Sequence, residues 1–154
     1  MVDRLLIRTD GASRSNPGPA SAGAVLIDAS LPGAEALDAA PVSVVARPLG
    51  VQTNNVAEYT ALVLALKEAQ RLGARSIDLR LDSKLIVEQL HGRWKVKDPK
   101  MREWWTEARG LLAAFDSWHA THEPRATNKA ADALANLALD DPAAAAALEA
   151  KYRS

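Results

Sequence analysis

Four acidic residues of the 154-residue sequence stand where their carboxylates could share metal ions: Asp10, Glu58, Asp82 and Asp132. Asp10 and Asp82 each follow a short stretch typical of a strand, so both are expected at a carboxyl end of a strand. Glu58 and Asp132 lie near the starts of two stretches with helical spacing. Four like charges brought together repel one another unless cations bind between them. Two divalent ions about 4 Å apart would fill the cluster and could hydrolyse a phosphodiester, one activating a water and the other stabilising the leaving oxygen.

Each acid taken alone also has an ordinary structural explanation. Asp10 could form a turn with Gly11, and Asp82 could cap the helix that follows it. Glu58 would be favoured in a first helical turn by the helix dipole, and Asp132 could be a solvated residue on its helix. The metal hypothesis therefore depends on the fold bringing the four acids together.

The composition limits which metals and partners are possible. Lysine plus arginine and aspartate plus glutamate both number 19, so bulk charge does not attract nucleic acid, although a local basic patch still could. The sequence has no cysteine and only three histidines, which leaves oxygen ligands and hard cations such as Mg²⁺ or Mn²⁺. No uncharged apolar run approaches about 18 residues, which predicts a cytoplasmic protein with no membrane span.

Hydrophobic periodicity predicts an α/β fold. Apolar and alternating runs indicate strands at 4–9, 22–28, 42–50, 76–82 and 116–122. Apolar residues at helical spacing indicate helices at 55–72, 83–92, 98–115 and 127–141. This order predicts a five-stranded mixed sheet, a three-strand antiparallel meander plus two parallel strands, with helices on both faces. We expect one domain over residues 1–141 and an alanine-rich C-terminal tail over 142–154, either a short helix or frayed.

Four stretches of the sequence, taken in order, resemble the motifs of the type 1 ribonuclease H family. They are TDGASRSNPGPASAG (9–23), TNNVAEYTAL (53–62), LDSKLIVEQL (81–90) and HEPRATNKAADALAN (122–136). The resemblance implies the ribonuclease H-like fold. It also implies that Asp10, Glu58, Asp82 and Asp132 are catalytic and bind two Mg²⁺ ions, for which Mn²⁺ can substitute. The implied reaction is endonucleolytic hydrolysis of the RNA strand of an RNA/DNA hybrid, leaving 5′-phosphate and 3′-hydroxyl ends.

The resemblance also implies which residues contact the hybrid. They are Gly11, Asn16, Thr53, Asn54, Asn55, Ser83, Lys84, Trp94 and Asn128. Gly11 would let a nucleic-acid backbone approach the sheet closely, and Asn16 with Thr53 is similar to the family's pocket for a phosphate of the DNA strand. The asparagine pair at 54–55 would reach the minor groove, and one of the two is expected to cap its helix.

The segment HGRWKVKDPK (91–100) is a local basic patch that contains an aromatic residue, Trp94. Such a patch suits the DNA strand, and a solvated turn between two helices is the alternative. Many bacterial members of the family carry a longer basic helix at this place. This sequence is therefore similar to the handle-less subgroup.

A residue before the fourth acid is expected to assist the reaction. The family often places a mobile histidine there, and His122 lies ten residues before Asp132. His122 is expected to end a strand, however, which leaves little loop to move. In the handle-less relatives an arginine takes this place, which implies Arg125. Arg125 stays charged at any working pH, so it could hold a phosphate but would shuttle protons poorly, and an ion pair with Glu123 is the alternative.

Other functions remain open from the sequence. A nuclease of the same superfold that acts on DNA would share the strand-end carboxylates but not the TNNxxE and NPGPxxxG patterns. A non-catalytic hybrid- or RNA-binding module would be favoured by a lost carboxylate, yet all four positions are filled. A phosphate-binding α/β domain would need a glycine-rich nucleotide loop such as GxxxxGK, which is absent. We therefore predict a monomeric, metal-dependent ribonuclease H.

Overall fold

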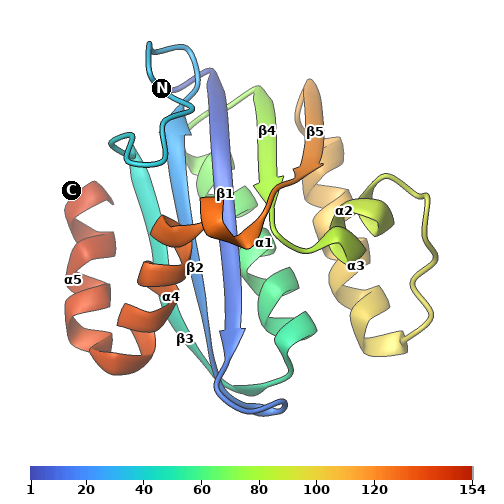
Figure 1. Cartoon of the computed structure of the whole chain (residues 1–154). Coiled ribbons are helices and arrows are strands. Elements are labelled where there is room, and N and C mark those ends of the chain that lie inside the picture. The colour runs from blue at the N-terminus through green and yellow to red at the C-terminus, as the bar shows by residue number, and fades with distance from the viewer. Residues whose placement is uncertain (154) are drawn as a thin grey trace.

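The computed structural model describes residues 1–153, which form a mixed sheet with helices around it (Figure 1). The strands are β1 (Arg4–Ser13), β2 (Gly18–Asp28), β3 (Ser43–Gln52), β4 (Ser76–Leu81) and β5 (Ser117–His122). The helices are α1 (Asn54–Arg71), α2 (Lys84–Leu90), α3 (Pro99–Ala113), the 3₁₀ helix η1 (Arg125–Thr127), α4 (Lys129–Asp140) and α5 (Pro142–Arg153). Within residues 1–153, no helix has the length and apolarity that a bilayer crossing requires.

The strands are arranged in the order β3-β2-β1-β4-β5. β1 pairs antiparallel with β2, and β2 pairs antiparallel with β3, whereas β4 is parallel to both β1 and β5. Figure 1 shows α1 behind the sheet and α4 and α5 in front of it, while α3 packs against α1. The predicted meander, the two parallel strands and the helices on both faces are therefore confirmed.

β1 is longer than the hydrophobic pattern predicts, and its length decides where Asp10 lies. The sequence pattern ends the strand at Asp10, but in the structure β1 stays paired with β2 as far as Ser13 and Ala20. Pairing with β4 stops earlier, at Thr9 and Leu81. Asp10 therefore lies within a strand, at the point where β1 loses its parallel neighbour. Glycine and alanine hid this extension because both are depleted in strands.

The N-terminal cap of α1 differs from the predicted one, and the cap of α2 is not Asp82, the alternative that the sequence left open. Thr53 caps α1, because its Oγ1 accepts a hydrogen bond from Val56 N at 3.3 Å, so neither residue of the asparagine pair is the cap. Ser83 caps α2, because its Oγ accepts from Ile86 N at 3.3 Å. Asp82 therefore does not cap α2, and the ordinary structural explanation for this aspartate does not apply.

α3 begins as the sequence predicts, whereas α4 does not. Asp98 caps α3, with its Oδ1 accepting from Lys100 N at 2.8 Å, and Pro99 occupies the first helical position. The predicted start of α4 at Thr127 is wrong, since Thr127 belongs to η1 and α4 begins at Lys129. The additional turn places Arg125 on a short helix of its own before α4.

The main core fills the space between the sheet and α1. Its completely buried side chains include Leu5, Ile7, Leu26, Leu62, Leu66 and Leu79. Tyr59 is buried beside them and donates a hydrogen bond from its hydroxyl to Gln89 Oε1 at 2.6 Å. This core fixes β1, β4 and α1 relative to one another, which gives the acidic residues on them a rigid mount.

The alanine-rich C-terminal segment forms α5, which packs against β3. Glu149 is nearly buried, and its Oε2 accepts a hydrogen bond from Ala46 N at 2.8 Å while Oε1 pairs with Arg47 at 3.2 Å. β3 is an edge strand, and open strand edges invite pairing with other chains. α5 therefore covers an edge of the sheet and satisfies one of its N–H groups.

Candidate active site

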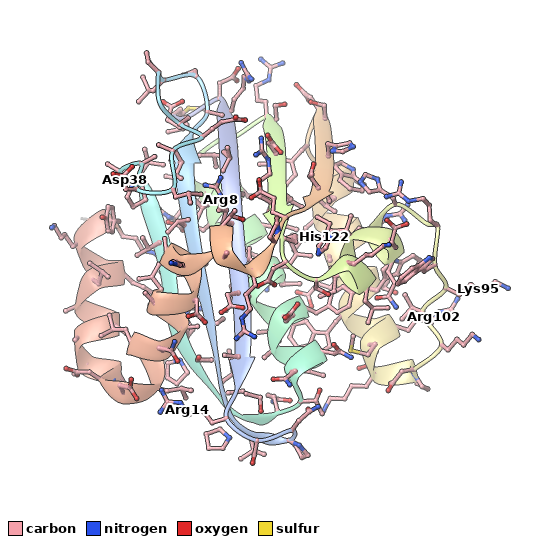
Figure 2. The ribbon with its side chains drawn as sticks, viewed as in Figure 1. Arg8, Arg14, Asp38, Lys95, Arg102 and His122 are labelled. Carbon is pink, nitrogen blue, oxygen red and sulfur yellow. The ribbon has the colours of Figure 1, made fainter. Side chains whose placement is uncertain are left out.

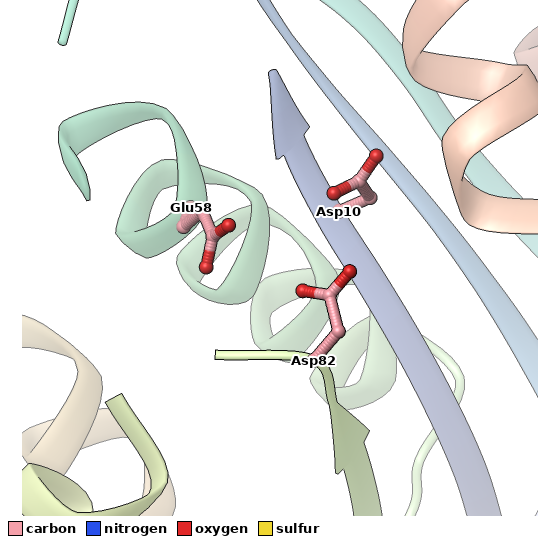
Figure 3. Close-up of side chains that lie close together, drawn as sticks. All are labelled: Asp10, Glu58 and Asp82. Carbon is pink, nitrogen blue, oxygen red and sulfur yellow. The ribbon is translucent and has the colours of Figure 1, made fainter. Parts of the chain in front are cut away.

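Asp10, Glu58 and Asp82 point toward one another beyond the end of β4 (Figure 3). Each contributes an oxygen that lies within 4.8 Å of the others. Asp10 comes from β1, Glu58 from near the start of α1, and Asp82 from the residue after β4. The structure thus brings three of the four predicted acids into one cluster.

Gly11 allows α1 to lie against β1 and so brings Glu58 to Asp10. A Cβ atom at this position would overlap with the backbone of Ala57 and with Glu58 N. The space that a side chain at Gly11 would fill is therefore taken by a helix of the protein itself, and the predicted approach of a nucleic-acid backbone to Gly11 stays a prediction. Gly11 still lines the cavity in which the three acids lie.

Asp132 joins the site from the other face of the sheet. Gly23 is the register partner of Asp10 in β2, and a Cβ atom on Gly23 would overlap with the carbonyl oxygen of Ala131 in α4. The close approach of α4 puts the Asp132 carboxyl within hydrogen-bonding reach of Asp10. Asp132 therefore adjoins the three-residue cluster through Asp10 and does not belong to the tight group itself.

Burial and the three other acids perturb the protonation of Asp10. Burial, as the largest cause, together with the hydrogen bond with Asp132 and the charges of Asp82, Asp132 and Glu58, raises the pKa of Asp10 from 3.8 to about 8. A rise of this kind is the signature of carboxylates that share a low-dielectric site. At neutral pH, Asp10 therefore favours its protonated form unless a cation lies beside it.

Two groups of interactions act in opposite directions on the pKa of Glu58. Burial and the charge of Asp82 raise the pKa of Glu58 to about 7. A hydrogen bond from Ser83 and the positive charge of Arg125 act in the opposite direction. Ser83 was predicted as a substrate contact, and in the structure its hydroxyl serves both the helix cap and the Glu58 carboxylate.

The donor set of this site fits hard divalent cations. Asp10, Glu58 and Asp82 offer only carboxylate oxygens, which Mg²⁺ and Mn²⁺ prefer to nitrogen or sulfur. Burial is the largest cause of the raised pKa values of Asp10 and Glu58, and the charges of neighbouring carboxylates add to it; a bound cation would favour the ionised form of both. The geometry and the electrostatics therefore both suit a metal site.

Asn128 lies beneath the acids and not on the surface of the cavity. It is 3% exposed, and its Nδ2 donates to Thr9 O at 2.8 Å and to Asp82 Oδ2 at 3.3 Å. These bonds tie the start of α4 to β1 and orient the Asp82 carboxylate. In this position Asn128 supports the acidic cluster from inside the protein. The substrate contact predicted for Asn128 stays a prediction.

Arg125 and His122 are separated by the structure. Arg125 lines a cavity of about 410 Å³ together with the three clustered acids. Glu123, the partner that the alternative interpretation gave to Arg125, instead pairs with Arg8 and Arg80. His122 lies exposed at the end of β5 (Figure 2). It is not among the residues of the described part of the chain, 1–153, that line this cavity.

A second pocket, of about 310 Å³, brings together Asn16 and Thr53, which were predicted to bind a phosphate of the DNA strand, and Asn55, which was predicted to reach the minor groove. Asn16 Oδ1 accepts a hydrogen bond from Asn54 N at 3.1 Å, so the asparagine side chain is held with its amide nitrogen still available. Lys100 lines the same pocket. From the sequence, Lys100 was assigned only to the basic patch at 91–100. The sequence pattern does not show that the start of α3 lies beside the start of α1.

A third pocket, of about 540 Å³, lies in the connection between α2 and α3 and is lined by cationic and aromatic side chains: Trp94, Lys95, Lys97, Arg102 and Trp105. Trp94 is 45% exposed. The ammonium group of Lys84 lies 5.9 Å from the Trp94 ring centroid, which is the geometry of a cation–π contact. The two residues predicted separately as substrate contacts therefore form one surface.

Comparison with known proteins agrees with this geometry. A family profile described as reverse transcriptase-like matches residues 8–138. Ribonuclease HI of Halobacterium salinarum is 49% identical over 132 residues, which cover 86% of this chain and 62% of that protein. This chain therefore spans less than two thirds of the length of that relative.

Two solved structures superpose on most of this chain. The crystal structure of RNase H1 from the archaeon Halobacterium salinarum NRC-1 superposes with a TM-score of 0.81 at 48% identity, covering 90% of this chain and 98% of that one. LC11-RNase H1, solved in complex with an RNA/DNA hybrid, gives a TM-score of 0.79 at 34% identity, covering 90% and 98% of the two chains. With the acids, the sheet order and these likenesses in agreement, the chain belongs to the type 1 ribonuclease H family.

Proposed function

We propose that this protein is a metal-dependent endonuclease that hydrolyses the RNA strand of RNA/DNA hybrids and leaves 5′-phosphate and 3′-hydroxyl ends. The observation that carries the proposal is the convergence of Asp10, Glu58 and Asp82 within 4.8 Å, with Asp132 adjoining Asp10. A relative of the same fold was solved with an RNA/DNA hybrid, which supports the choice of substrate.

The acids would hold two Mg²⁺ ions, and Mn²⁺ could substitute for them. When bound, such ions activate a water and stabilise the oxygen that leaves the phosphodiester. The chain's own residues prepare the site for this chemistry. Asn128 orients the Asp82 carboxylate, and Ser83 donates to Glu58. Arg125 lies on the wall of the same cavity, where its fixed positive charge would hold the scissile phosphate.

The two neighbouring pockets suggest how a hybrid lies on the protein. The pocket formed by Asn16, Thr53, Asn55 and Lys100 offers amide, hydroxyl and ammonium donors, which suit a phosphate of the DNA strand. The surface of Lys84 and Trp94 offers a cation and an aromatic face, which would suit another part of the DNA strand. Cleavage of RNA alone would follow from contacts with ribose 2′-hydroxyls near the acids.

The decisive experiment incubates the protein with an end-labelled RNA/DNA hybrid, with Mg²⁺ and separately with EDTA. We expect internal cuts in the RNA strand only, and none in EDTA. Equal cutting of a DNA/DNA duplex of the same sequence would instead indicate a DNA nuclease of the same fold. Tight binding of the hybrid with no cutting in Mg²⁺ or Mn²⁺ would indicate a non-catalytic binding module.

We further propose that the protein acts as a monomer, because the four acids and the three pockets all come from one chain. Sedimentation at the concentrations used for the cleavage assay tests this directly. A dimer with higher specific activity than the monomer would contradict it. The cytoplasmic location predicted from the sequence stays a prediction.

A further inference from the structure

Two arginines on neighbouring strands hold the same carboxylate, that of Glu123. Arg8 in β1 and Arg80 in β4 are register partners, so their side chains leave the sheet on the same face (Figure 2 labels Arg8). Arg8 Nε lies 3.3 Å from Glu123 Oε1, and Arg80 Nη1 lies 3.2 Å from Glu123 Oε2. The Arg8 side chain is 5% exposed and that of Glu123 is 22% exposed, so solvent screens these contacts only partly.

Glu123 is placed where it can control the segment that carries Arg125. Its backbone N–H donates to Leu81 O at 2.8 Å, which extends the β4–β5 pairing by one residue. The chain then turns through Pro124 into η1, where Asn128 N donates to Arg125 O at 3.0 Å. Arg125 therefore lies two residues after the anchored carboxylate.

The other end of this segment is anchored as well. Asn128 is buried, and its Nδ2 donates to Thr9 O at 2.8 Å. Residues 123–128 are thus fixed to the sheet at both ends, by an ion pair at Glu123 and by an amide at Asn128. Between these two anchors, Arg125 reaches the cavity of the acids.

We infer that Glu123 is a positioning residue: held by Arg8 and Arg80, it fixes the short turn that presents Arg125 to the reacting phosphate. This inference rests on the proposed function of Arg125 at that site. A displacement of a reacting group by about 1 Å can cost up to roughly 100-fold in rate, so a small loosening of the turn would be visible in turnover. Glu123 is not one of the residues within 1–153 that line the cavity of the acids, so it acts through Arg125.

The arrangement also provides a matched control. Arg80 has two further acidic partners, Asp78 at 2.7 Å and Glu35 at 2.7 Å. The Glu35 side chain is 74% exposed and lies far along the sequence from the Arg125 turn. Glu35→Ala therefore removes a carboxylate from the same arginine without touching the turn.

The test measures kcat and KM of hybrid cleavage for Glu123→Ala, Glu123→Gln and Glu35→Ala, each in the wild-type and the Arg125→Ala backgrounds. We expect Glu123→Ala to lower kcat roughly tenfold with KM changed by less than about twofold. Glu123→Gln, which retains both the chain length and a hydrogen-bond acceptor, should recover part of the loss. Glu35→Ala should leave kcat unchanged. In the Arg125→Ala background, the effect of Glu123→Ala should fall below about twofold.

Amide hydrogen exchange supplies a readout that does not depend on cleavage. In Glu123→Gln, the amides of residues 125–128 should exchange faster while those of β1 and β4 keep their wild-type rates. If Glu123→Ala lowers kcat equally in the wild-type and the Arg125→Ala backgrounds, the inference is overturned. Wild-type exchange rates of amides 125–128 in Glu123→Gln would overturn it as well, even if Glu123→Ala does not fold. If the wild-type protein does not cleave the hybrid, the proposed function fails, and the exchange measurement still decides whether Glu123 holds the turn.

Discussion

Asp10 and Gly23 are register partners across β1 and β2, and Gly23 lets α4 lie so close to the sheet that Asp132 reaches Asp10. Ser21 reinforces the same contact, because its Oγ donates to Ala135 O at 2.6 Å. A glycine on one strand therefore sets the spacing between two acids on a different strand and a helix.

Gly23→Ala should both destabilise the protein and impair catalysis. The new Cβ would overlap with the backbone of α4, which is not a flexible side chain and must move as a unit. We expect a loss of about 1–3 kcal/mol in the free energy of unfolding, measured by urea denaturation, together with lower turnover. Gly110→Ala is the control, because it lies within α3 with open space around it and should stabilise by roughly 0.5–1 kcal/mol. Equal effects of the two substitutions would contradict this account.

Asp10→Asn should abolish hybrid cleavage while leaving the fold intact. Above about pH 8, where Asp10 is ionised, the substitution removes one of four crowded negative charges, so at such pH the metal-free variant should melt at the same or a higher temperature than the wild type. Added Mg²⁺ should raise the melting temperature of the wild type more than that of the variant. Thermal unfolding followed by circular dichroism, with EDTA and with Mg²⁺, checks both statements. Near-normal activity of Asp10→Asn would reject the metal model.

The raised pKa of Asp10 predicts how stability depends on pH in the metal-free protein. Its pKa rises from 3.8 to about 8 on folding, so between these values the folded state binds more protons than the unfolded state. The stabilising contribution is complete below pH 3.8 and is lost as pH rises toward about 8. We expect the wild type to lose more stability than Asp10→Asn between about pH 5 and about pH 9 in EDTA. Saturating Mg²⁺ should reduce this difference, and parallel curves for the two proteins in EDTA would exclude the shift.

Arg125→Ala should lower turnover by about 10- to 100-fold, or roughly 1.4–3 kcal/mol of activation free energy, with little change in hybrid binding. Arg125 lines the cavity of the acids, whereas His122 lies exposed at the end of β5. His122→Ala should therefore matter less. The comparison is made by steady-state cleavage and by binding of an uncleavable hybrid. A steep loss in His122→Ala beside a mild loss in Arg125→Ala would reverse the two roles.

The sequence by itself predicted a three-strand antiparallel meander plus two parallel strands and most of the helix positions, and it identified the acids that we propose carry the chemistry. Alternating and helical periodicities persist locally, so they predicted β4, α1 and α3 nearly to the residue. The four acids were identifiable because each occupies a recognisable motif. The extension of β1 beyond Asp10 was missed, since its glycine and alanine residues gain their strand conformation from pairing with β2.

Only the tertiary structure decided how those residues are held. Gly11 and Gly23 matter through helix backbones that come from other parts of the chain, and Asn128 matters through Thr9 and Asp82. Glu123 reads in the sequence as a neighbour for Arg125, yet its partners are two arginines on separate strands. Such contacts depend on strand register and on the distance between helix and sheet, which are set by long-range packing and leave no local pattern in the sequence.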